Sequence, residues 1–117
     1  TKNEYAKIEK LSYFGDPSLV YDVSISRYEG ILYFPAAVIR DGRMLFYYNG
    51  GYGKKIPDEA ALKKIITEAL ADQKKYVVII ATDIDGFVAK AEKIKAPSDE
   101  FVGADEKIRN RLYELGI

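Results

Sequence analysis

The chain has 117 residues, the usual size of one domain, so we expect a single domain over residues 1–117. Hydrophobic residues make up 48% of it and charged residues 31%, a composition that excludes disordered and collagen-like chains. The absence of histidine and cysteine excludes disulfides, thiolate zinc sites and catalytic centres built on an imidazole or a thiol. The 18 basic residues balance the 18 acidic ones, so no net charge draws the chain to nucleic acid or to an anionic membrane.

The sequence shows no sign of membrane insertion or export. No apolar run approaches the roughly 20 residues that a membrane-spanning helix needs. Residues 1–15 also lack the basic start and continuous apolar core of a secretory signal. We therefore expect a cytoplasmic protein, with the alternative that a signal peptide was removed before residue 1.

The first residues favour a short helix. Apolar side chains recur every third position over residues 4–14, which is the spacing of one helix face. A strand is the alternative, because the segment is rich in serine and aromatic residues. The apolar positions are Tyr5, Ile8, Leu11 and Phe14.

Three strands at about 19–27, 31–40 and 43–49 predict an antiparallel meander. Pro35 cannot donate a ladder hydrogen bond, which indicates an edge position or a bulge. Asp41-Gly42 predicts a tight hairpin turn, because such turns need residues that tolerate positive φ. The apolar residues of the first strand alternate with others and are expected to share one face: Leu19, Tyr21, Val23 and Ile25.

The second half of the chain predicts a strand between two helices. Pro57-Asp58-Glu59 opens an amphipathic helix over 57–74. Residues 76–82 are apolar at almost every position, so we expect a central strand, buried on both faces. Strand, helix and strand in this order predict a right-handed parallel crossover. An amphipathic helix over about 99–115, capped by Ser98 or Asp105, completes the chain.

The segment 87–94 is either a strand that returns from Asp85-Gly86 or the first turns of a helix, and we favour the strand. The fold class is α+β. With two strands after the central helix, the order of elements resembles that of bacterial secretion chaperones at the level of the fold.

The segment from Ile80 to Gly86 resembles the first motif of haloacid-dehalogenase-type phosphatases, in which an apolar strand ends in Asp-x-Asp-Gly. The resemblance gives Asp83 the role of nucleophile and Asp85 that of proton carrier. It covers seven residues and ends at Phe87, where the family has threonine, and only about 30 residues follow. The chain therefore lacks the room for the other motifs of that family.

The same segment also matches part of a calcium loop. Ala81 stands where that loop needs its first carboxylate ligand. A turn built from Asp and Gly is therefore the favoured interpretation. The residues that match are Asp83, Asp85, Gly86, Val88 and Glu92.

Three glycines and two lysines lie just before the helix over 57–74, where backbone amides and positive charge suit a phosphate. The segment is not a Walker loop, since Ile56 stands where that loop has Ser or Thr. A parallel crossover would place it beside Asp83 and Asp85, at the carboxyl ends of neighbouring strands. A solvated loop is the alternative. The candidate ligand-binding residues are Gly50, Gly51, Tyr52, Gly53, Lys54, Lys55, Asp83 and Asp85.

Tyr47 and Tyr48 are candidates for an interface. Alternation along a strand sends them to opposite faces, so we expect at most one of them in the core. An exposed tyrosine suits a protein interface or stacks on the bases of single-stranded nucleic acid, and zero net charge favours a protein partner.

We therefore expect a non-catalytic binding module, without metal or cofactor, that contacts a partner protein or a second copy of itself. The alternative is a binder of a phosphate-bearing small molecule or nucleotide at residues 50–55, near Asp83 and Asp85. An enzyme built on paired carboxylates and tyrosine is a third possibility.

Overall fold

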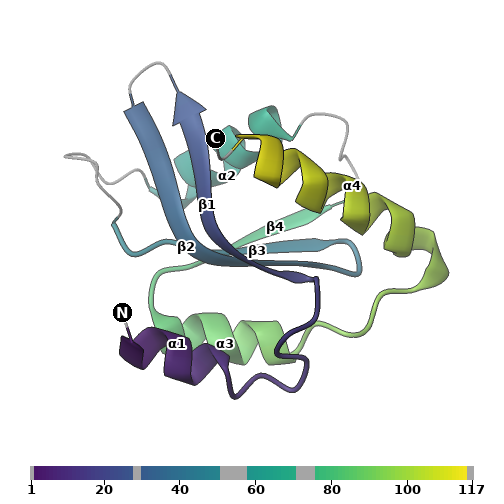
Figure 1. Cartoon of the computed structure of the whole chain (residues 1–117). Coiled ribbons are helices and arrows are strands. Elements are labelled where there is room, and N and C mark those ends of the chain that lie inside the picture. Colours follow the sequence, from purple (N-terminus) through teal and green to yellow (C-terminus); the bar gives the residue numbers. More distant parts are fainter. Residues whose placement is uncertain (1, 28–29, 51–57, 71–75, 116–117) are drawn as a thin grey trace.

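A four-stranded mixed sheet with helices on both faces forms the fold of the computed structural model, which describes residues 2–27, 30–50, 58–70 and 76–115 (Figure 1). The α+β prediction is confirmed. The elements are α1 (Lys2–Ile8), β1 (Leu19–Arg27), β2 (Gly30–Arg40), β3 (Arg43–Tyr47), α2 (Glu59–Ala69), β4 (Val77–Ala81), α3 (Ile84–Glu92) and α4 (Asp99–Leu115).

The meander and the crossover are both present. β1 pairs with β2 and β2 pairs with β3, each time antiparallel. Asp41 and Gly42 connect β2 to β3 with φ values of 49° and 77°, as the predicted tight turn requires. β4 then pairs parallel with β3, with Tyr47 opposite Ala81. Helix α2, which connects these two strands, begins after the N-cap Asp58, whose carboxylate accepts the N–H of Ala61 at 2.7 Å.

β4 lies at the edge of the sheet, so the prediction of a central strand is wrong: the strand order is β1-β2-β3-β4. Its apolar composition comes from the helices that cover both of its faces. Ile80 belongs to the core beneath α2 and α4, whereas Ala81 belongs to the core beneath α1 and α3. Val77, at the other end of the strand, is 58% exposed.

Residues 84–92 form helix α3, so the preference for a strand over 87–94 is wrong. The buried side chains Ile84, Phe87 and Ala91 recur every three or four residues, which is a helical period. Asp83 begins the helix as its N-cap, with its carboxylate accepting the N–H of Gly86 at 2.6 Å. The element order thus departs from that of the secretion chaperones, because a helix follows β4 directly.

Two hydrophobic cores lie on opposite faces of the sheet, and Figure 1 shows the helices that cover them on the two sides of it. One lies beneath α2 and α4 and includes Phe34, Phe46 and Ile66. The other lies beneath α1 and α3 and includes Leu45 and Phe87. The predicted N-terminal helix is confirmed, although α1 ends at Ile8. Both faces of the central strands are therefore covered.

The face of β1 changes along the strand. Leu19 and Tyr21 pack into the core beneath α1 and α3, whereas Val23 and Ile25 pack into the other core. The prediction that all four share one face is therefore wrong. Asp22 between them has a φ of 53°, and this irregular residue interrupts the alternation. Asp22 and Pro35 lie between the pairs Tyr21–Ala36 and Val23–Phe34, and the register is the same on both sides of them, so no residue is inserted there as a bulge would require.

A network of hydrogen bonds holds the β2–β3 turn against α4. Asp105 is not a helix cap as one interpretation had it: its side chain is buried. Its carboxylate accepts the N–H of Asp41 at 3.0 Å and the hydroxyl of Tyr76. The carboxylate of Asp41 in turn accepts the N–H of Ser98 at 3.1 Å. The carbonyl of Ser98 accepts the first N–H groups of α4, as expected at a helix start.

None of the described helices is both long enough and apolar enough to cross a membrane.

Candidate functional site

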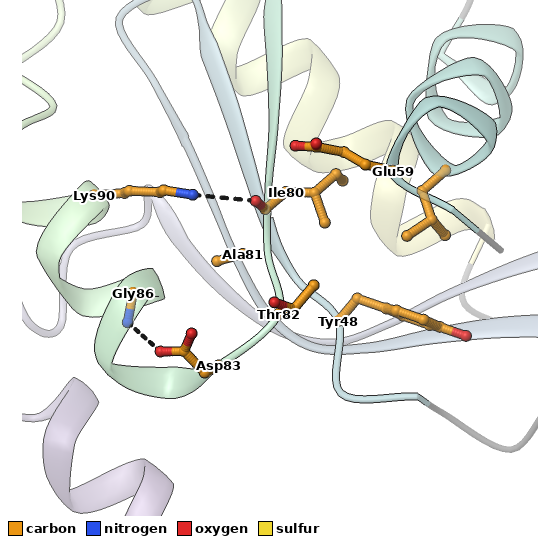
Figure 2. A pocket seen from close by; sticks show the side chains of 9 residues that line it. Tyr48, Glu59, Ile80, Ala81, Thr82, Asp83, Gly86 and Lys90 are labelled. Carbon is orange, nitrogen blue, oxygen red and sulfur yellow. Dashed lines mark hydrogen bonds between the residues drawn. The ribbon is translucent and has the colours of Figure 1, made fainter. Parts of the chain in front are cut away.

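The carboxyl ends of β3 and β4 lie side by side. The N–H of Tyr48 donates to the carbonyl of Ala81 at 2.8 Å, which extends the parallel pairing beyond the end of β3. A pocket with a volume of about 280 Å³ opens at this point, between the first turns of α2 and helix α3 (Figure 2). The residues that line it are Tyr48, Glu59, Leu62, Ile80, Ala81, Thr82, Asp83, Gly86 and Lys90.

The structure brings only some of the predicted ligand-binding residues together. Asp83 lines the pocket, and Gly50 lies next to it, because its carbonyl accepts the hydroxyl of Tyr48 at 3.3 Å. Asp85 does not line the pocket: its carboxylate pairs with Lys7 of α1 at 2.8 Å. The remaining candidates lie outside the described residues: Gly51, Tyr52, Gly53, Lys54 and Lys55.

Tyr47 and Tyr48 are both buried, each with 3% of its surface exposed. They face opposite cores as predicted, but the prediction that at most one belongs to the core is wrong, because helices cover both faces of β3. The hydroxyl of Tyr47 donates to the carboxylate of Glu4. Burial, followed by this hydrogen bond, raises the pKa of Tyr47. The ring of Tyr48 packs against Phe34.

The segment from Asp83 to Gly86 begins a helix and is not a loop. The two aspartates play different roles there, since Asp83 caps α3 and Asp85 pairs with α1. In the described part of the chain, no group of three or more carboxylates is placed to hold a metal ion. The phosphatase-like sequence thus serves as a strand end followed by a helix cap.

The charged groups of the pocket differ in how they are partnered. The carboxylate of Asp83 accepts the N–H of Gly86, and that of Glu59 lies 3.8 Å from the amine of Lys63. The amine of Lys90 donates to the carbonyl of Ile80 at 3.3 Å. Within the described ranges, no carboxylate pairs with Lys90. Lys90 is the one cationic side chain among the described residues that line the pocket, beside the carboxylates of Asp83 and Glu59.

Sequence reasoning missed Lys90, Thr82 and Glu59. Lys90 could have been found once residues 84–92 were taken as a helix, because positions 83, 86 and 90 then fall on one side of it. Interpretation as a strand concealed this relation. Thr82 could have been included with Asp83, because it directly precedes that residue after the end of β4. No local signal marks Glu59, since its place depends on how α2 crosses the sheet.

Comparison of the chain with protein-family models, with curated proteins and with solved structures finds no match.

Proposed function

We propose that this chain is a non-catalytic binding domain that holds a phosphate-bearing small molecule in the pocket at the carboxyl ends of β3 and β4. The observation that carries the proposal is the parallel pairing of these strands, which places Tyr48, Thr82 and Asp83 around one cavity. In open α/β sheets, ligands usually bind in a crevice outside the carboxyl ends of the parallel strands.

The connection between β3 and α2 supports a phosphate as the ligand group. It leaves β3 next to Tyr48 and reaches α2, whose Glu59 lines the pocket. Both ends of this connection therefore lie at the pocket, and its sequence contains Lys54 and Lys55. Lysine is a common partner of phosphate in proteins.

The size of the pocket favours a small ligand. Its volume of about 280 Å³ lies just below the roughly 300–1,000 Å³ typical of small-molecule sites. A sugar phosphate or a mononucleotide therefore suits it better than a dinucleotide. Contact with a partner protein or a second copy stays a prediction, and the two tyrosines chosen for it are buried.

Thermal unfolding in the presence of phosphate compounds tests the proposal. The probes are inorganic phosphate, ribose 5-phosphate and AMP, each with and without magnesium, and ribose is the control. At 100 times its dissociation constant, a ligand stabilises the folded state by about 2.7 kcal/mol. For 117 residues this corresponds to a rise in Tm of about 10 °C. The proposal is wrong if no phosphate compound raises Tm above the ribose control.

A pair of double variants tests the part played by the connection. Lys54→Ala with Lys55→Ala is expected to weaken binding of the phosphate compounds while the protein stays folded. Lys93→Ala with Lys95→Ala, two exposed lysines that do not line the pocket, removes the same charge and serves as the control. Equal affinities of the two double variants would exclude Lys54 and Lys55 from the site.

A further inference from the structure

Lys90 reaches from α3 to the outer edge of β4. Residues 77 and 81 of β4 direct their backbone groups toward β3, since the N–H of Val77 donates to Gly42 and the carbonyl of Ala81 accepts from Tyr48. The backbone groups of successive residues in a strand point alternately to its two sides, so the carbonyl of Ile80, the residue before Ala81, points away from β3. The amine of Lys90 donates to this outward carbonyl at 3.3 Å, and Figure 2 shows the Lys90 side chain extending from α3 to the Ile80 carbonyl of β4.

The amine of Lys90 has capacity for further partners. A lysine ammonium group carries three donors, and a single carbonyl at 3.3 Å occupies one of them at a long distance. Of the two pocket carboxylates, that of Asp83 accepts the backbone N–H of Gly86 and that of Glu59 lies 3.8 Å from the amine of Lys63, and no other cation is among the described residues that line the pocket. Lys90 therefore contributes the positive charge that an anionic ligand group in this pocket would meet.

We propose that Lys90 recognises the anionic group of the ligand and so selects phosphorylated compounds over their neutral counterparts. This inference rests on the proposed function and assigns its charge recognition to a residue of α3. The lysine stem is flexible, so the amine is able to turn from the Ile80 carbonyl to a phosphate oxygen. If Lys90 only covered the edge of β4, its replacement by methionine would leave the preference for ribose 5-phosphate over ribose unchanged.

Three variants separate recognition from structure. Lys90→Met keeps the apolar stem and removes the charge, whereas Lys90→Arg keeps the charge. Lys93→Met removes an exposed lysine of the same segment that does not line the pocket. Isothermal titration with ribose 5-phosphate and with AMP measures the dissociation constant of each variant. Thermal unfolding establishes that each one is folded, and Lys90→Gln replaces Lys90→Met if the latter is not.

We expect Lys90→Met to raise the dissociation constant for both phosphate compounds at least about tenfold, as for loss of a charge-assisted hydrogen bond. Lys90→Arg should stay within about threefold of the unmodified protein, and Lys93→Met should be unchanged. If the unmodified protein binds both probes and Lys90→Met binds them equally well, this inference fails while the proposed function stands. If the unmodified protein binds neither probe, both fail.

Discussion

Replacement of Asp105 by alanine is expected to destabilise the fold strongly. The Asp105 side chain belongs to a residue that is 1% exposed, and its carboxylate accepts the N–H of Asp41 and the hydroxyl of Tyr76. Asp105→Ala leaves both donors without that acceptor. Since each buried donor without a partner costs about 1–3 kcal/mol, we expect the free energy of unfolding to fall by about 3 kcal/mol. A domain of this size has a total stability on the order of 10 kcal/mol.

Urea denaturation followed by circular dichroism measures this change. The expected loss corresponds to a fall in Tm of about 12 °C. Glu106→Ala is the matched control, because Glu106 is the next residue of α4 and is exposed; its effect should stay within about 0.5 kcal/mol. If Asp105→Ala lies within about 1 kcal/mol of this control, the buried carboxylate does not hold the turn against α4 as described.

Five further substitutions have defined outcomes. Gly42→Ala should lower the free energy of unfolding by about 1–3 kcal/mol, because Gly42 has a φ of 77° and an added Cβ would lie 2.8 Å from an aromatic ring. Gly103→Ala, at a helical position with open space, should raise the free energy of unfolding by up to about 1 kcal/mol. Equal urea midpoints for the two glycine variants would contradict these opposite effects. Burial, and then its hydrogen bond to a carboxylate, raises the pKa of Tyr76. The resulting stabilisation is complete below the unfolded pKa of about 10 and is lost as the pH rises through the higher folded pKa. Urea titrations at several alkaline pH values should therefore show stability falling more steeply in the unmodified protein than in Tyr76→Phe, and parallel curves would argue against the shift. Asp85→Asn removes an exposed ion pair worth at most about 1 kcal/mol and should leave binding of ribose 5-phosphate unchanged. Asp83→Ala removes the cap of α3 and should lower the free energy of unfolding by about 1 kcal/mol. If Asp85→Asn bound ribose 5-phosphate more weakly than the unmodified protein, Asp85 would be part of the binding site.

Several elements could be predicted because their causes lie within a few residues. The turn at Asp41-Gly42 follows from the tolerance of those two residues for positive φ. Helix α2 follows from its capping Asp58 and from apolar side chains on one face. The pairing of β3 with β4 followed from the strand–helix–strand order, and it predicted where Asp83 would lie relative to β3.

The errors arose where a local pattern fits two structures. Asp83 to Gly86 suits a turn or a helix cap, and the choice between them depends on the surface that Phe87 and Ala91 pack against. The alternation of β1 predicts one continuous face, but the irregular Asp22, opposite Pro35, exchanges the two faces midway. Such exchanges depend on the partner strand and leave little trace in the strand itself.

Length, composition and short-range patterns were enough to establish an α+β chain with one crossover, and to exclude chemistry based on histidine or cysteine. Burial of both Tyr47 and Tyr48, the edge position of β4, and the approach of Lys90 to Ile80 came from the packing of helices on the two faces of the sheet. The burial of the tyrosines and the edge position of β4 depend on contacts between residues that are distant in sequence, and the approach of Lys90 to Ile80 depends on α3 forming as a helix beside β4, so the pattern of neighbouring residues does not predict them.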